Sequence, residues 1–351
     1  MQEDLLALVK TSLTVVLTIG YSFSSWATCV SHSPNERTHN VCIVSSMNNA
    51  SLTQKQYDQI VTQLRLSGNM LGDIGSAEYP SFFDFNLRPV VKWDSNANGG
   101  NPNKPLTLGG FTFTGDETFN QKPGLLAGLA ASISARRVIR EGSFIDVNSY
   151  ITVTQPINYY LTVLEHGYTV CGKIGLVRNF FFDHCYSQNS IEKKIRNSHI
   201  YTKKFVLGQV IETTSGAMSV EVVKEIQKSD SLITIKDSAI LTNESHNAAA
   251  YQVELFNKNP HQTTPSALSS KGVKLSLYAN WFDRNSYIVL SHEQFSTQAF
   301  LGYPVERTTE GISFGSELIT GRHAELSLIN QRSNVDYYSG LSYSFALRFS
   351  H

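Results

Sequence analysis

Charged residues are the first thing that this sequence has little of. Lys, Arg, Asp and Glu make up 17% of its 351 residues, against roughly 25% in an average soluble domain. The 29 basic and 29 acidic residues balance, so the chain lacks the basic excess that nucleic-acid binding requires. Aromatic residues reach 11%, which is not typical of a disordered chain. We therefore expect a folded protein with no nucleic-acid partner.

Catalytic motifs are also lacking. The sequence contains no H-E-x-x-H, no G-x-S-x-G and no Gly-rich phosphate loop. His292 and Glu293 would point to opposite faces of a strand, so these neighbours do not form a catalytic pair. His323 and Ser327 have no further partner in the sequence. We expect no enzyme and no cofactor, and a hydrolase site at the rim of a barrel is the third functional alternative.

The N-terminus has the features of an export signal. After Lys10 an uncharged stretch runs from Thr11 to Ala27, with small residues, Ser25 and Ala27, at positions −3 and −1 of a cleavage site. Residues 1–27 are therefore predicted to be a signal peptide. The alternative is an uncleaved membrane anchor, since Leu5 to Ala27 would cross a bilayer, which takes ~20 residues, if the Lys10 side chain extended to the interface.

Cysteines are few, and their spacing supports export. The chain has 4, and an even number in an exported protein predicts disulfides. Four cysteines allow three connectivities, of which we favour the local one, Cys29–Cys42 and Cys171–Cys185. A zinc site that recruits His184 beside Cys185 is disfavoured because no C-x-x-C spacing is present.

Residues 28–80 differ from the rest of the chain and form a predicted periplasmic lead segment. His32–Arg37 is typical of a loop. Tyr57, Ile60, Val61 and Leu64 recur at helical spacing, which predicts one helix over about 52–67. We expect this helix to pack on the neighbouring domain or to close its periplasmic mouth.

From residue 81 onward, large apolar residues alternate with small or polar ones, the pattern of strands with one apolar and one polar face. The predicted strands are 82–93, 123–138, 143–154, 160–172, 179–189, 199–211, 216–227, 231–242, 247–257, 271–282, 285–296, 307–319, 322–332 and 337–349. We expect 81–351 to form an all-β transmembrane antiparallel β-barrel of about 14 strands (range 12–16), because such barrels have even strand numbers and apolar outer faces. The alternative is a soluble periplasmic or secreted all-β binding protein.

The C-terminal strand carries a motif. Gly340, Tyr343 and Phe345, with a further aromatic at Phe349, resemble the signal by which the assembly machinery recognises bacterial outer-membrane β-barrel proteins. The chain departs from that signal by ending in Ser350-His351. The resemblance implies the outer membrane of a Gram-negative bacterium, with its lipids and the barrel assembly machinery as partners.

The connections between strands suggest which end of the barrel faces outside. Short links at 228–230, 283–284 and 320–321 are typical of periplasmic turns, and longer ones at 94–122, 190–198, 258–270 and 297–306 of external loops. Lys193-Lys194-Arg196 and Lys203-Lys204 are the main concentration of basic residues. They are expected to lie in a solvated loop and on the lumen face.

One loop resembles half of a calcium-binding motif. Asp94, Asn96 and Asn98 recur every second residue before Gly99, as in an EF-hand, but Pro105 stands where the twelfth-position Glu belongs. A calcium site and a turn whose side chains bond to their own backbone are the alternatives here.

These features predict a channel, a translocation pore or a surface scaffold in the outer membrane. A short helical lead followed by about fourteen strands is similar in layout to the surface lipoprotein assembly modifier family. That likeness implies a role in surface lipoprotein export, with an exported protein or lipoprotein as cargo. The chain departs from the family because it has one helix in place of an array of helical repeats.

Overall fold

The computed structural model describes residues 29, 34–47, 54, 57–58, 61, 64, 81–100, 106–108, 111–114, 116–140, 142–157, 161–176, 179–195, 197–229, 232–246, 249–260, 268–281, 284–297, 305–319, 322–334 and 339–349. The predicted signal peptide, 1–27, lies outside these residues. Of the predicted helix 52–67 only Gln54, Tyr57, Asp58, Val61 and Leu64 are described, and all five are helical. No helix in the described ranges has the length and hydropathy of a membrane span.

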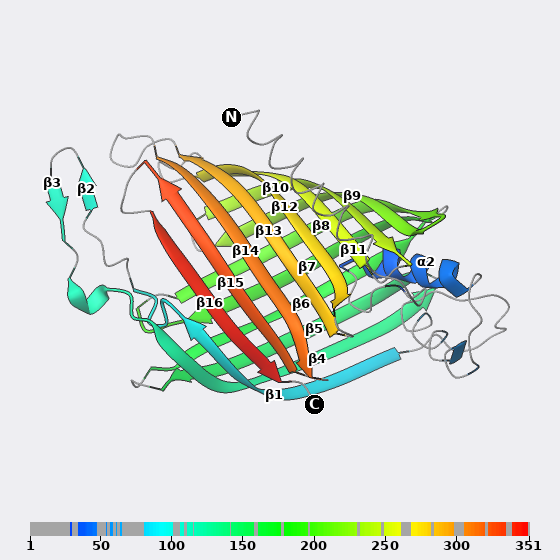
Figure 1. Ribbon diagram of the computed structural model, residues 1–351, viewed down its shortest axis with the longest axis horizontal. Coiled ribbons are helices and arrows are strands. Elements are labelled where there is room, and N and C mark those ends of the chain that lie inside the picture. The colour runs from blue at the N-terminus through cyan, green and yellow to red at the C-terminus, as the bar shows by residue number, and fades with distance from the viewer. Residues whose placement is uncertain are drawn as a thin grey trace.

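Fourteen strands close into one antiparallel barrel (Figure 1). They are β1 (Ser81–Asp94), β4 (Gly124–Arg140), β5 (Ser143–Pro156), β6 (Val163–Gly175), β7 (Phe180–Glu192), β8 (Asn197–Thr213), β9 (Gly216–Ser229), β10 (Leu232–Ser245), β11 (Ala249–Pro260), β12 (Leu268–Trp281), β13 (Arg284–Thr297), β14 (Glu306–Ile319), β15 (Arg322–Ser333) and β16 (Gly340–Phe349). Each strand pairs with its neighbour along the chain, and β1 pairs with β16 to close the ring. The fold class and all fourteen predicted strands are confirmed.

Alternation along each strand separates an outer from an inner face. On β9, Val220 and Val222 are 46% and 63% exposed, while Ser219, Glu221 and Val223 between and beside them are buried. On β1, Phe83, Phe85 and Leu87 are the exposed set. A barrel in a bilayer turns its large apolar side chains outward to the lipid, as this one does. A soluble β-sandwich would instead bury these side chains in its core. The soluble alternative is therefore wrong.

The two ends of the barrel differ in their connections. At the end where β1 begins and β16 finishes, here called the turn end, the links between strands are 141–142, 176–179, 214–215, 246–248, 282–283 and 320–321. At the opposite end, here called the loop end, the links are 95–123, 157–162, 193–196, 230–231, 261–267, 298–305 and 334–339. Short turns face the periplasm in such barrels, so we expect the turn end to be the periplasmic one.

Two expectations about the connections need correction. The short link predicted at 228–230 lies at the loop end, because strands alternate in direction and this link follows the seventh strand of the barrel. The loop predicted at 190–198 is only 193–196, since β7 and β8 extend further than expected. The first loop also contains a small hairpin, β2 (Leu106–Leu108) and β3 (Phe111–Phe113), and a 3-10 turn, η1 (Glu117–Phe119).

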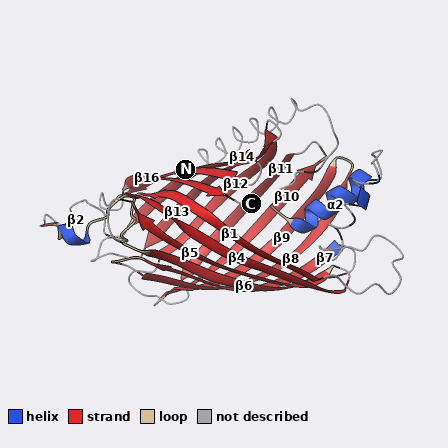
Figure 2. Cartoon of the chain, turned by 90° about the horizontal axis from the view of Figure 1, so that it is seen from below, coloured by secondary structure: helices blue, strands red, loops and turns tan. Residues whose placement is uncertain are grey.

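A helix that the sequence did not predict precedes the barrel. Helix α2 (Glu36–Met47) begins inside the segment expected to be a loop, His32–Arg37. Figure 2 shows it alongside β8, β9 and β10 at one end of the barrel, and it contacts all three strands. In Figure 1 this end is opposite the β2–β3 hairpin, so α2 lies at the turn end.

Candidate functional site

The candidate site is the barrel lumen at the turn end, where α2 meets the inner wall. In the described parts of the chain, the strand residues that contact α2 or its cap residue Asn35 belong to the inward-facing set. They are Arg136, Lys173, Phe181, Asp183, Val206, Val210, Ala217, Ser219, Glu221, Val223 and Glu244. Helix α2 therefore lies inside the barrel and narrows its mouth at the turn end.

Asn35 starts the helix and fastens it to β9. Its side-chain oxygen accepts hydrogen bonds from the backbone amides of Arg37 and Thr38, at 2.9 and 3.1 Å. This is N-capping, which satisfies amides that the first turn leaves unpaired. The same side chain donates to Glu221 and to Ser219 on the inner wall. The cap and the wall contact share one residue, so helix formation and docking are coupled.

The first helical residue joins a cluster of charges on the opposite wall. Glu36 forms ion pairs with Arg136 on β4 and with Lys173 on β6. Both cations also contact Asp146 on β5, with Arg136 Nε 2.5 Å and Lys173 Nζ 3.2 Å from its carboxylate. The side chain of Phe144 is 2% exposed and carries the Arg136 guanidinium 4.1 Å from its ring centre. Glu36 supplies the second negative charge that these two cations need.

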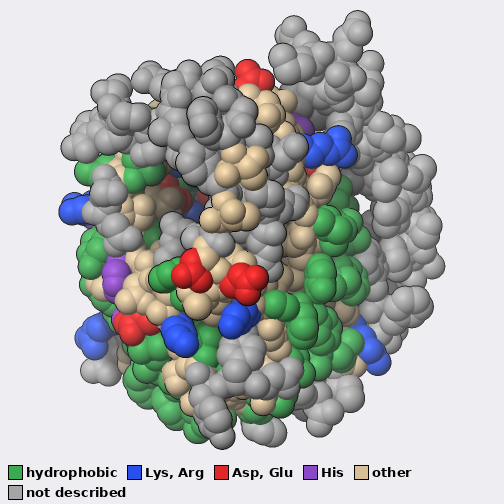
Figure 3. All heavy atoms as spheres, turned by 90° about the vertical axis from the view of Figure 1, so that its left-hand side faces the viewer, with side chains coloured by type: hydrophobic (Ala, Val, Ile, Leu, Met, Phe, Trp, Pro, Cys, Tyr) green, Lys and Arg blue, Asp and Glu red, His purple; other side chains and the backbone are tan. Residues whose placement is uncertain are grey.

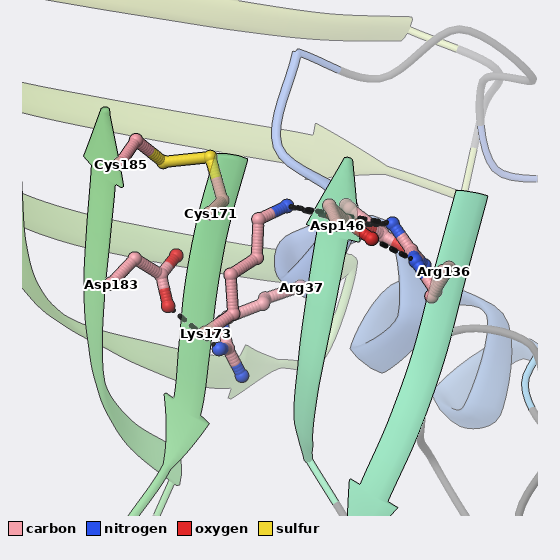
Figure 4. The surroundings of a disulfide bond; sticks show 8 residues. Arg37, Arg136, Asp146, Cys171, Lys173, Asp183 and Cys185 are labelled. Carbon is pink, nitrogen blue, oxygen red and sulfur yellow. Dashed lines mark hydrogen bonds and ion pairs between the residues drawn. A yellow bond between two sulfur atoms is a disulfide. The ribbon is translucent and has the colours of Figure 1, made fainter. Parts of the chain in front are cut away.

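Arg37 holds α2 against β7. Its guanidinium lies 2.8 Å from the carboxylate of Asp183 and donates a 3.1 Å hydrogen bond to the carbonyl of Gly142 in the first tight turn. It also stacks 4.7 Å from the ring centre of Phe181. Figure 4 shows Arg37 and Asp183 facing one another beside the pair formed by Arg136 and Asp146. A planar guanidinium suits this combination of carboxylate, carbonyl and aromatic contacts.

Further along the helix, His39 and Cys42 complete the docking. The Nδ1 atom of His39 lies 2.7 Å from a carboxylate oxygen of Glu244, a side chain with no exposed surface. Cys42 is fully buried among apolar inner-wall residues of β7, β8 and β9. It forms a disulfide with Cys29, so the preceding chain is tied to the docked helix.

The second disulfide links two neighbouring strands. Cys171 on β6 and Cys185 on β7 are register partners with Cα atoms 4.1 Å apart, and both belong to the lumen face (Figure 4). Both predicted disulfides are thus present. His184 faces outward, away from Cys185, and stacks on Phe205. The sulfurs of Cys29 and Cys42 approach Glu244, but a disulfide offers no thiolate for a metal.

These pairings predict the thiol chemistry of the protein. Denatured without reductant, the chain should take up no maleimide, and after reduction it should take up four equivalents, as counted by mass spectrometry. A Cys171→Ser/Cys185→Ser variant should take up two after reduction and still none before it. Labelling of that variant before reduction would contradict the pairing of Cys29 with Cys42.

Parts of the inner wall away from α2 are exposed. On β5 both faces are accessible, since the inward Tyr150 is 39% exposed and the outward Ile151 is 46% exposed. On β16 the inward Ser342 and Ser344 are exposed. By contrast the inward Ser219 on β9 is 0% exposed, because α2 covers it. Inward side chains are therefore accessible to water on β16 and at the middle of β5.

Ion pairs line the inner wall toward the loop end. Lys92 pairs with Glu165, Lys236 with Glu254, and Lys258 with Glu293. Acidic and basic groups alternate around the lumen, so its fixed charge is mixed. The structure gives no reason to expect strong ion selectivity. In Figure 3, which views the loop end, charged side chains of both signs gather on the end face, and hydrophobic ones cover the flanks.

The calcium candidates form a hydrogen-bonded turn. Asp94 accepts a bond from the amide of Asn96 and pairs with Lys193 Nζ at 2.7 Å. The Asn98 side-chain oxygen accepts from the amides of Gly100 and Lys122, and Gly99 has the positive φ, 73°, of a sharp turn. The Lys193 ammonium contacts the carboxylate that calcium would need, so the geometry favours the turn interpretation.

The same loop contains a carboxyl group with a shifted pKa. Asp116 caps the turn η1 by accepting hydrogen bonds from the amide and the hydroxyl of Thr118, at 2.9 and 2.8 Å. These donors stabilise the carboxylate and hold the pKa of Asp116 below its usual value. The bonds order a fully external segment and do not point to a ligand.

The remaining sequence candidates are dispersed. His292 and Glu293 face opposite sides of β13, as expected, with His292 near Glu310 outside and Glu293 bonded to Lys258 and Ser270 inside. Ser327 pairs with Ser313 within the lumen. Gly340, Tyr343, Phe345 and Phe349 all lie on β16, and their role as an assembly signal stays a prediction.

The sequence did not identify the residues that bind α2. The wall members Arg136, Asp146, Lys173, Asp183 and Glu244 are scattered over a hundred positions, and only the barrel topology brings them together. One signal was available: each is a charged residue at an inward position of an alternating strand, near its turn end. Asn35 directly before Glu36 was a second signal, because it is a good helix cap.

A closed barrel with an apolar exterior and a polar, charged lumen defines an integral β-barrel protein of the outer-membrane type. No protein-family model matches this sequence, and no curated protein matches it. The layout resemblance to surface lipoprotein assembly modifiers therefore gains no support.

Solved structures with a similar fold are outer-membrane proteins. One is a loop L8 deletion mutant of OmpT, an outer membrane protein of Vibrio cholerae, with a TM-score of 0.43 and 7% identity over 77% of this chain and 99% of that one. OprD of Pseudomonas aeruginosa has a TM-score of 0.39 and 8% identity, covering 81% of this chain and 98% of that one. A BenF-like porin from Pseudomonas fluorescens Pf-5 has a TM-score of 0.37 and 7% identity, covering 78% of this chain and 99% of that one. At such TM-scores the likeness carries no argument about function, which must come from this chain's own lumen.

Proposed function

We propose that this protein is an outer-membrane channel whose periplasmic mouth is narrowed by helix α2. The observation that supports it most directly is the contrast within the lumen. Inward side chains on β16 and at the middle of β5 are exposed, whereas those of β8, β9 and β10 near the turn end are covered by the helix. A scaffold would have no need for a solvated interior lined with hydrophilic side chains.

The docking contacts support a defined position for the helix. Ion pairs to β4, β6 and β7, and the contact between His39 and Glu244 on β10, hold α2 on both sides of the mouth. The buried Cys42 adds apolar contacts with β7, β8 and β9. The helix thus restricts the pore from one defined position.

Single-channel recording tests the proposal. We expect the purified, folded protein to insert into planar bilayers and to give small, discrete conductance steps, with little preference between potassium and chloride because the lumen charge is mixed. Heat-dependent mobility on a gel confirms that the sample is a folded barrel. Folded protein that inserts repeatedly without any conductance would contradict the channel and favour a scaffold.

A further inference from the structure

The outer wall of β8 and β9 carries a basic cluster. Lys203, Lys224 and Lys228, here called the lysine triad, all have exposed side chains. The register pairs Lys203 with Ile226, which lies between Lys224 and Lys228 on the same face of β9. Lys203 is therefore a diagonal neighbour of both other lysines, within reach of long side chains.

The triad points away from the lumen. Leu207 and Val222 are outward residues, at 54% and 63% exposure, and the lysines lie an even number of positions from them along the same strands. This corrects the expectation that Lys203 and Lys204 share a lumen face: only Lys204 points inward. Three cations thus belong to the surface that faces lipid.

The height of the triad matches one membrane interface. A strand in such a barrel climbs about 2.5 Å per residue along the membrane normal, given its rise and tilt. Lys224 follows Gly216 at the turn end by eight positions, which places it roughly 20 Å above that end. Lys228, and Lys203 beside it, lie roughly 25–30 Å up. Since the apolar band is about 25 Å tall, Lys203 and Lys228 lie at the headgroups of the outer leaflet, and Lys224 lies just below them, within reach of that level through its long side chain.

The protein supplies little negative charge to the triad. Asp237 on β10 is the register partner of Lys224 and is exposed on the same face. Within the described parts of the chain, no carboxylate lies within ion-pair distance of any of the three lysines. Elsewhere on the outer wall the protein pairs its own charges, because Glu310 lies 3.8 Å from both His292 and Arg332. The triad therefore favours an anion from outside the chain.

We propose that the lysine triad binds the phosphate groups of a phosphorylated glycolipid of the outer leaflet. Ammonium groups on flexible stems can reach the headgroup level and contact phosphate oxygens. Tyr186 and Tyr201, the register partners of Lys203 and Lys228, add hydroxyl groups at the same level. The acyl chains of that lipid would cover Leu207, Val220 and Val222 beneath them. This site lies outside the lumen, so it does not depend on channel activity, only on the loop end facing outward.

Native mass spectrometry of the full-length, folded protein in detergent tests this site. Bisphosphorylated lipid A is titrated in, and lipid A lacking both phosphates and phosphatidylglycerol serve as comparisons. We expect bisphosphorylated lipid A to bind most tightly. Each basic residue near an anionic lipid contributes about fivefold in affinity, so the Lys203→Gln/Lys224→Gln/Lys228→Gln variant should bind on the order of 100-fold more weakly.

A matched control variant distinguishes the loss of lipid affinity caused by the triad from a loss caused by removing any positive charge on the outer face. Lys271 is exposed on the outer face of β12, and Lys271→Gln should leave the affinity unchanged. If the triple variant fails to fold, each single variant should still show its fivefold loss. Equal binding of the phosphate-free lipid, or equal losses in Lys271→Gln and the triad variants, would overturn the proposal. Tighter binding of phosphatidylglycerol would overturn the assignment to a glycolipid.

Discussion

Reversing the charge of Arg37 should open the channel. In the Arg37→Asp variant we expect the single-channel conductance to rise severalfold, because the new carboxylate would face Asp183 and release α2 from the mouth. The two side chains of the wild-type pair are only 16% and 13% exposed. Breaking a largely buried pair costs about 3 kcal/mol or more, which is over a hundredfold in the docking equilibrium. The hydrogen bond to Gly142 and the stacking on Phe181 are lost as well.

The reciprocal swap provides the control for this experiment. Arg37→Asp/Asp183→Arg restores opposite charges at the same contact, so its conductance should fall back toward that of the wild type. Lys258→Gln breaks a lumen ion pair near the loop end and should leave the mouth narrowed, with the conductance of the wild type. If Arg37→Asp folds, inserts and conducts like the wild type, α2 does not restrict the pore. If the swap conducts as strongly as the single variant, the charge pair is not what holds the helix.

The barrel was predictable because lipid imposes a simple rule on the sequence. A strand with one face in hydrocarbon alternates strictly, so Leu341, Tyr343 and Phe345 mark β16 without any knowledge of its partners. The same rule fixes strand direction. Links alternate between the two ends, which would have placed the link between β9 and β10 at the loop end despite its shortness. Link length alone was the wrong criterion there.

Helix α2 was not predictable from periodicity. Its buried residues are Thr38, His39, Asn40, Cys42, Ile43 and Ser45. Most are polar because the helix packs inside a hydrophilic lumen, so it has no apolar stripe of the kind by which helices are recognised. The docking partners could not be assigned either, because Glu36 meets Arg136 and Lys173 only after the barrel has closed. A local pattern contains no information about contacts made across a pore.

A charge placed on the outer face should destabilise the barrel, whereas the same charge one residue later should not. Ile133 on β4 is 41% exposed toward lipid, near mid-height, and Ser134 faces the lumen opposite Asp84 of β1. We expect Ile133→Arg to lower the free energy of unfolding by about 2–4 kcal/mol, the cost of an arginine near the bilayer midplane. Ser134→Arg should change it by less than about 1 kcal/mol, because its guanidinium stays in water beside a carboxylate. Urea titration in lipid vesicles, followed by tryptophan fluorescence, measures both.

The comparison between these two neighbours decides which face of the sheet meets the membrane. Side chains at positions 133 and 134 share the same depth and the same strand, so depth and strand stability cancel between the variants. A larger loss of stability for Ser134→Arg than for Ile133→Arg would reverse the assignment of the two faces. The lumen, the position of α2 within it and the external lysine triad would then all have to be reassigned, since each is defined by the same alternation.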